Sequence, residues 1–266
     1  MYKILILAAV QGIAEFLPIS SSGHLVILGA LLEALSSSVS ELGESATLEI
    51  ILHAGTLGSI LVVFWKRILN LLTSDRRVLP LLVIGTVPAA IVGLTIKSQF
   101  STLLTNPTLA AAMLLMTGCM LVVLGRLSPR DGCYTGLNWR AAAIIGCFQA
   151  FAILPGISRS GSTILGGRLL GLKNEDSVTF SFLLAIPAIL GASLLAIKDI
   201  WQQASAGETL EFSIIELAVG ASVSFLVGVV ALTWLIGWSR KDRLHWFAYW
   251  CFPAGLWALC HFNGFL

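Results

Sequence analysis

The stretch that decides the fold is Gln11-Gly-Ile-Ala-Glu15-Phe-Leu-Pro18-Ile-Ser20-Ser21-Ser22-Gly23-His24-Leu25. It places an amide, a carboxylate, serine hydroxyls and an imidazole inside an otherwise apolar run. Ionisable groups are costly at membrane depth, so they face a cavity or a partner and usually mark function. Pro18 and the serines also divide the run into two short helices, and such irregular backbone exists at membrane depth only where protein buries it.

A second copy of this pattern lies about half a chain later. It reads Gln149-Ala-Phe-Ala-Ile-Leu154-Pro155-Gly156-Ile157-Ser158-Arg159-Ser160-Gly161-Ser162-Thr163 and aligns with the first copy if one glycine is inserted. The first copy carries the carboxylate and the imidazole, whereas the second carries a guanidinium. We therefore interpret the two copies as halves of one site.

The composition is that of a membrane protein. The chain is 57% hydrophobic and 11% charged, with a mean hydropathy of +0.91, which excludes an ordinary soluble domain. A net charge of +2 without any basic run argues against a nucleic-acid partner. The cysteines show no paired spacing and most lie in apolar segments, so we expect neither zinc nor a disulfide framework. The N-terminal segment is expected to be mature structure and not a signal peptide.

The predicted fold is an all-α, polytopic integral membrane protein built from two inverted-topology repeats. Each repeat is expected to hold a broken, re-entrant helix pair followed by three transmembrane helices, about six full spans in all. The first repeat covers residues 1–127, with the re-entrant pair at 1–34 and spans at about 47–65, 78–97 and 107–126. A cytoplasmic linker at 128–139 leads to the second repeat at 140–266, with its pair at 140–172 and spans at about 176–197, 212–237 and 245–265.

The basic residues predict the orientation. Most of the 16 fall in four segments, which hold Lys66, Arg67, Arg76 and Arg77; Arg126, Arg130 and Arg140; Arg168 and Lys173; and Arg240, Lys241 and Arg243. The positive-inside rule puts these segments in the cytoplasm and both termini outside. The two halves then have opposite topology, a plan that places a binding site near the midplane, where the broken helices meet.

The second copy has the groups that bind phosphate. Arg159 offers a fork that matches phosphate oxygens, and the following helix would point its positive end at an anion. Glycines 156 and 161 let backbone N–H groups turn toward the ligand, and the hydroxyls of Ser158, Ser160, Ser162 and Thr163 add donors. The structural alternative is a serine-rich helix cap beside an arginine that pairs with Glu15.

The first copy has groups suited to phosphoryl transfer. Gln11 and Glu15 share a helical face, while Ser21 and His24 supply a nucleophile and an acid or base. Glu15 is also a candidate ligand for a divalent cation, because magnesium prefers oxygen ligands. A proton-coupled transporter would use the same residue types. Glu49 and His53 share a face at the start of a span, where a supporting role and a purely structural one are equally compatible with the pattern.

Both motifs resemble the signatures of the undecaprenyl-diphosphate phosphatase family, which is associated with bacitracin resistance. The resemblance covers essentially the whole chain, with both motifs in order. It implies a multi-pass enzyme of the bacterial inner membrane that removes the terminal phosphate from undecaprenyl diphosphate and so regenerates the lipid carrier of peptidoglycan synthesis. It also implies a site that faces the periplasm and a divalent cation, usually Mg²⁺. Membrane lipids are the other expected partners, and a homodimer is left open.

The family motifs are carried over residue by residue. The residues expected to be catalytic are Glu15, Ser21, His24 and Arg159, and Glu15 is also a candidate metal ligand. The residues expected to bind the substrate are Gln11, Ser20, Ser22, Gly156, Ser158, Ser160, Gly161 and Thr163. Relatives of this family carry either Glu or Gln at position 11, and Gln removes one potential metal ligand. The nucleophile is left open among Ser21, His24 and water.

Two other functions share some of these features. The acid phosphatase superfamily that also acts on lipid diphosphates has a Ser-Arg motif followed by a histidine, but Leu165 stands where that histidine belongs. A flippase for polyprenyl phosphate, alone or combined with hydrolysis, fits the inverted repeats. The spacing of Ser21 and His24 favours hydrolysis, because a carrier needs no nucleophile.

Overall fold

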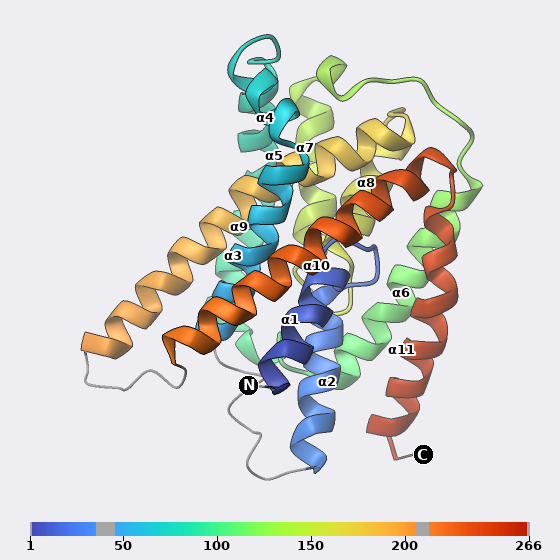
Figure 1. Cartoon of the computed structure of the whole chain (residues 1–266). Coiled ribbons are helices and arrows are strands. Elements are labelled where there is room, and N and C mark those ends of the chain that lie inside the picture. Colours follow the sequence, from blue (N-terminus) through green and yellow to red (C-terminus); the bar gives the residue numbers. More distant parts are fainter. Residues whose placement is uncertain (1, 36–45, 206–212, 265–266) are drawn as a thin grey trace.

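A computed structural model of the chain describes residues 2–35, 46–205 and 213–264 (Figure 1). Every element in these ranges is helical. The first half contains α1 (Tyr2–Ala14), α2 (Ser21–Leu35), α3 (Ala46–Val63), α4 (Trp65–Leu72), α5 (Val78–Gln99), η1 (Ser101–Leu103) and α6 (Pro107–Arg126). The second half contains η2 (Tyr134–Gly136), α7 (Trp139–Phe151), α8 (Arg159–Leu169), α9 (Asn174–Ser205), α10 (Ile214–Arg240), η3 (Leu244–Phe247) and α11 (Ala248–Phe262).

Among the described residues, 4 helices are long and apolar enough to cross a membrane. They are Val78–Gln99, Pro107–Arg126, Asn174–Leu195 and Ile215–Arg240, which match four of the six expected spans. The expected span at 47–65 belongs to a pair, α3 and α4, that bends by 74° at Phe64. The span expected at 245–265 instead consists of η3 and the 15-residue helix α11. The chain is therefore a multi-pass membrane protein with four such spans, or five if the bent pair counts as one.

Asparagine and serine caps set where several helices begin. Asn106 accepts a hydrogen bond from Leu109 N at 3.0 Å and starts α6 with Pro107 in its first turn. Asn138 caps α7 in the same way, through Ala141 N at 2.9 Å. Ser213 and Glu216 form a reciprocal capping box on α10. These caps satisfy N–H groups that would otherwise lack partners at a helix start.

The first helix of each half packs against a helix of the other half. α1 packs on α10, and α7 packs on α5. Glycine permits both close crossings, since a Cβ on Gly12 would lie 2.9 Å from Ser224 O, and one on Gly146 would lie 2.9 Å from Gly85 Cα. Each half therefore supplies a wall for the short helix of the other.

The central linker is fastened to the junction of α8 and α9. Arg168 donates to Leu172 O at 2.8 Å and to Ser128 O at 3.0 Å, and Gly132 forms an isolated bridge with Leu172. Asp176 accepts from Tyr134 N at 3.0 Å and also pairs with Lys173. The hydrogen bond from Lys173 to Asp176 raises the pKa of Lys173. The linker and α4 lie at one end of the molecule, opposite the start of α1 and the end of α11 (Figure 1).

Candidate active site

The two helix breaks meet in the protein interior. The first break joins α1 to α2, and the second joins α7 to α8. Between them lies a small polar cavity of about 30 Å³. It is lined by Ala14, Glu15, Ser20, Ser21 and Ser22 from the first break and by Ala152, Ile157, Ser158 and Arg159 from the second. Both copies of the motif therefore line one cavity, as the sequence predicts.

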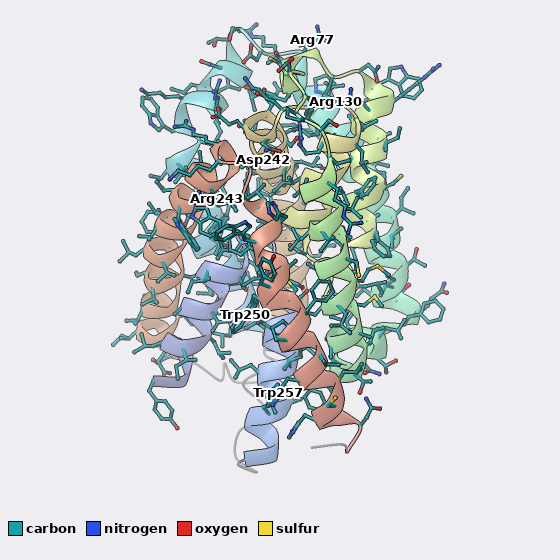
Figure 2. All side chains as sticks on the ribbon, turned by 90° about the vertical axis from the view of Figure 1, so that its right-hand side faces the viewer. Arg77, Arg130, Asp242, Arg243, Trp250 and Trp257 are labelled. Atoms are coloured by element: carbon teal, nitrogen blue, oxygen red, sulfur yellow. The ribbon has the colours of Figure 1, made fainter. Side chains whose placement is uncertain are left out.

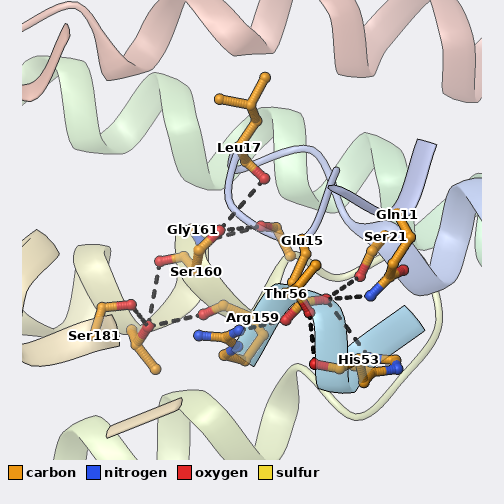
Figure 3. A network of polar contacts seen from close by, with 12 residues as sticks. Gln11, Glu15, Leu17, Ser21, His53, Thr56, Arg159, Ser160, Gly161 and Ser181 are labelled. Atoms are coloured by element: carbon orange, nitrogen blue, oxygen red, sulfur yellow. Dashed lines mark hydrogen bonds and ion pairs between the residues drawn. The ribbon is translucent and has the colours of Figure 1, made fainter. Parts of the chain in front are cut away.

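Glu15 is the centre of the polar network (Figure 3). One carboxylate oxygen, Oε1, pairs with Nη2 of Arg159 from the opposite half of the chain. The other, Oε2, accepts from Ser21 Oγ at 2.8 Å and from Gln11 Nε2 at 3.2 Å, and lies 3.7 Å from His53 Nε2. His53 thus contacts the site, the supporting role that the sequence left in balance with a structural one.

Arg159 keeps one end of its guanidinium available. Its side chain is 18% exposed, and its Cζ lies 5.7 Å from the centre of the Phe182 ring. Nη1 is buried and has no hydrogen-bond partner among the described residues. A buried charged donor without a partner is costly, so this nitrogen is suited to an anion that enters the cavity.

The first break is a strained turn with no spare room. Ser20 has a φ of 70°, in the left-handed region that non-glycine residues seldom adopt. Its Oγ accepts from Gly23 N at 3.2 Å and so caps α2. A Cβ on Gly23 would lie 2.6 Å from Gly156 Cα and 2.8 Å from Gly156 N. The backbones of the two breaks therefore touch, and only glycine permits that contact.

Thr117 of α6 holds the second break, and sequence reasoning missed it. Its Oγ1 donates to Gly156 O at 2.7 Å and accepts from Ser158 N at 2.9 Å. Gly156 itself has a φ of +94°. The available signal was a buried hydroxyl in the middle of an apolar span, but many threonines in such spans bond only to their own helix.

Most hydroxyls of the second copy point into the protein. Ser158 lines the cavity and caps α8 through Gly161 N at 3.1 Å. Ser160 reaches Leu17 O at 3.4 Å, and Ser162 donates to Ser158 O at 2.7 Å. Thr163 bonds to Arg159 O and to Ser181 Oγ. The structure thus gives these side chains the capping and fastening roles of the structural alternative, and substrate binding by Gly156, Ser160, Gly161 and Thr163 stays a prediction.

His24 is not directed at the Glu15–Arg159 pair. Its Nδ1 lies 2.7 Å from Ser20 O, and its Nε2 accepts from the indole nitrogen of Trp250 at 2.9 Å. It is not among the residues that line the cavity. A direct catalytic role for His24 therefore stays a prediction, and the geometry assigns it to the support of the Ser20 turn.

The donor set suits a cation that the substrate helps to hold. No group of three or more histidine, cysteine or acidic side chains gathers in metal-binding geometry in the described parts of the chain. However, Gln11 Oε1 is buried without a hydrogen-bond partner there, next to Glu15. Magnesium is commonly bound by one or two carboxylates together with substrate phosphates, so Glu15 and Gln11 match that pattern of oxygen ligands.

Comparison with known proteins agrees with this geometry. A family model described as "Bacitracin resistance protein BacA" matches residues 4–257. A protein from Rhodopirellula baltica named "Undecaprenyl-diphosphatase" is 69% identical over 256 residues, which cover 96% of both chains. Proteins of the same name from Alkaliphilus metalliredigens and Methanosphaera stadtmanae are 35% and 36% identical, over 96% and 95% of this chain and 96% and 94% of their own.

The family model spans both helix breaks and every residue that lines the cavity. The similarity to the acid phosphatase superfamily ends at a few residues, and Leu165 is a buried core residue of α8. The chain therefore belongs to the family described as bacitracin resistance protein BacA.

Proposed function

We propose that this chain is an undecaprenyl-diphosphatase, which hydrolyses the terminal phosphate of undecaprenyl diphosphate to give undecaprenyl phosphate and phosphate. The observation that carries the proposal is the Glu15–Arg159 pair, which joins the two motifs beside a polar cavity and leaves Arg159 Nη1 unpaired. The names of the relatives supply the substrate. Such an enzyme recycles the lipid carrier of cell-wall synthesis and protects against bacitracin, whereas a carrier function draws no support from these names.

The site binds the diphosphate through charge. Arg159 lies in the first turn of α8, an 11-residue helix whose positive end points at the break. Its free Nη1 takes a phosphate oxygen, and the hydroxyls of Ser20, Ser22 and Ser158 along the cavity are further donors. Stabilisation of charge on the transferring group is the main task of a protein in phosphoryl transfer. The polyprenyl tail stays in the lipid.

Ser21 is the nucleophile that the geometry favours. Its Oγ donates to Glu15 Oε2 at 2.8 Å, so Glu15 accepts the proton as Ser21 attacks the terminal phosphorus. The bond to the bridging oxygen breaks, and undecaprenyl phosphate leaves. Glu15 passes its proton to the leaving phosphate and becomes a carboxylate again. It then takes a proton from the water that attacks the phosphoserine, and that proton returns to Ser21 Oγ as phosphate leaves. A trapped phosphoenzyme that maps to His24, or a failure to trap any, would replace this route.

The proposed site for a divalent cation is formed by Glu15 and Gln11 Oε1. Mg²⁺ is the proposed cation because it prefers oxygen ligands. It would supply positive charge beside the phosphate oxygens when bound. Glu15 pairs with Arg159 in this structure. When Arg159 turns toward the substrate, the oxygens of Glu15 and Gln11 would become available to the cation.

The finer architecture follows from the same motif pair. The reciprocal packing of α1 on α10 and of α7 on α5 supports two inverted repeats, with the breaks near the midplane. Arg77, Arg130 and Arg243 lie toward the end of the molecule that carries the linker (Figure 2). The positive-inside rule makes that end cytoplasmic and both termini periplasmic, and the resemblance to a family of inner-membrane phosphatases implies that the site faces the periplasm.

The test is phosphate release from undecaprenyl diphosphate by purified protein. We expect release that EDTA abolishes and that Arg159→Ala lowers at least about a hundredfold, the usual cost of a lost charge-stabilising group. Arg140→Ala is the matched control, because Arg140 is exposed at the start of α7 and stacks on Trp139. Full activity in Arg159→Ala, or no release from folded wild-type protein, would refute the proposal.

A further inference from the structure

Trp250 contacts the first break from α11, a segment that the sequence predicts only as a membrane span. It lies on α11 (Figure 2) and is 55% exposed, and its Nε1 donates to His24 Nε2 at 2.9 Å. The two rings are tilted by only 13° with centroids 6.1 Å apart, so the bond runs near the plane of both rings. An indole N–H at a lipid-facing surface otherwise lacks a partner, which favours this bond.

The bond fixes the tautomer of His24. Since Nε2 accepts from Trp250, the proton of the neutral ring resides on Nδ1 and is donated to Ser20 O, 2.7 Å away. Two hydrogen bonds in series therefore connect the surface of α11 to the first break. The opposite tautomer would place an N–H against the indole N–H and an acceptor nitrogen against a carbonyl oxygen.

The carbonyl that His24 holds belongs to the strained residue of the site. Ser20 has a φ of 70°, a conformation that persists only when its surroundings enforce it. The next residue, Ser21, donates to Glu15. The orientation of the Ser20 carbonyl thus sets the direction in which Ser21 points.

We propose that Trp250 is a positioning residue, which acts through the Nδ1–H tautomer of His24 to hold the Ser20–Ser22 turn in its reactive geometry. The inference rests on the proposed function, since that turn lines the proposed phosphatase site. It differs from interfacial anchoring, which needs only the aromatic ring at the lipid surface.

The same helix offers a matched control. Trp257 is also on α11, is 48% exposed, and stacks on a histidine, His261, at 5.4 Å and 12°. His261 lies at the end of α11 and does not line the cavity. Removal of the N–H at Trp257 therefore tests anchoring by an indole of this helix without touching the Ser20 turn.

The experiment compares Trp250→Phe with Trp257→Phe in steady-state phosphate release from undecaprenyl diphosphate. We expect Trp250→Phe to lower kcat about three- to tenfold, the usual range for one neutral hydrogen bond, with KM unchanged. Trp257→Phe should leave both constants unchanged. Trp250→3-benzothienylalanine keeps the bicyclic shape and replaces the N–H by sulfur. Its kcat should equal that of Trp250→Phe, which would assign the loss to the missing N–H donor and not to a packing defect.

A second readout does not depend on activity. In ¹⁵N spectra of histidine-labelled protein, with His24 assigned by the loss of its signals in His24→Gln, we expect the Nδ1–H tautomer in the wild type and a mixture of tautomers in Trp250→Phe. Equal losses of kcat in both tryptophan variants, or an unchanged kcat in Trp250→Phe, would overturn the inference. An inactive wild type with the expected tautomer would instead refute the phosphatase and leave the Trp250–His24–Ser20 connection standing.

Discussion

At the scale of single residues, the site depends on how Glu15 divides its two oxygens. Oε1 neutralises Arg159, and Oε2 collects donors from Ser21 and Gln11. The pair is buried, so removal of either partner leaves an uncompensated charge in the interior. In the proposed mechanism, a diphosphate that enters the cavity competes with Glu15 for Arg159, and this competition frees the carboxylate to take the proton of Ser21.

In the proposed site, Gln11 sets how tightly the cation is held. Gln11→Glu replaces the unpaired Oε1 and the amide by a second carboxylate one helical turn before Glu15, so we expect half-maximal activity at a Mg²⁺ concentration several-fold lower. The measurement is phosphate release against Mg²⁺ concentration. An unchanged half-saturation value would place the cation elsewhere, and Gln149→Glu, at the corresponding position of the second copy, is the matched control.

At the scale of elements, two neighbouring contacts hold the helix breaks together. The first is the contact of Gly23 with Gly156, where the two backbones touch. The second is Thr117, which bonds both sides of the second break from α6. Neither contact touches the substrate in the proposed mechanism, yet both decide whether Glu15 and Arg159 meet.

Gly23→Ala should separate the breaks. Its new methyl would lie 2.6 Å from Gly156 Cα, so either the turn or the α8 start must move, and we expect phosphate release to fall at least about tenfold. Gly191→Ala is the control, because a Cβ at Gly191 in α9 meets nothing within 4 Å. Activity of Gly23→Ala equal to that of Gly191→Ala would show that the close approach is not needed.

Thr117→Val keeps the shape of the side chain and removes its hydroxyl. Gly156 O and Ser158 N then lose their partner in the interior, so we expect a loss of stability of about 1–3 kcal/mol in thermal unfolding in detergent. Thr86→Val on α5 serves as the comparison, since Thr86 only returns a bond to Leu82 O in its own helix. Equal unfolding temperatures for both variants would contradict the role given to Thr117.

Sequence patterns anticipated which segments meet better than how their side chains point. The proline and serine runs predicted both breaks, and the separation of Glu15 from Arg159 predicted that the halves share a site. The direction of the hydroxyls of Ser160 and Thr163 depends on Leu17 O and Ser181, which are distant in sequence. Thr117 and Trp250 were missed for the same reason, because their partners become visible only when α6 and α11 are packed.

At the scale of the whole molecule, the membrane orientation that the basic residues predict can be tested with a native cysteine. Cys133 is exposed in the linker, whereas Cys119 and Cys147 lie on α6 and α7. In a variant that retains only Cys133, we expect a membrane-impermeant maleimide to leave this thiol unlabelled in intact spheroplasts and to label it once the membrane is permeabilised.

The control for orientation is Ser101→Cys in the same background. Ser101 is exposed in η1, between α5 and α6, in a loop that the charge pattern places outside. This variant should be labelled without permeabilisation. Labelling of Cys133 from outside would reverse the orientation and move the site to the cytoplasmic face.

The packing of α1 on α10 has a consequence for how the protein is made. α1 leaves the ribosome first, but α10, the helix on which it packs, is synthesised near the end of the chain. Arg159 also follows Glu15 by 144 residues. At about 5–20 residues per second, the carboxylate of Glu15 waits roughly 7 to 30 seconds for its counter-charge. During that interval the nascent chain holds an acid without its counter-charge, directly after a helix too short to cross the bilayer. We therefore expect the first hairpin to be sheltered from lipid during insertion until the second half has been synthesised.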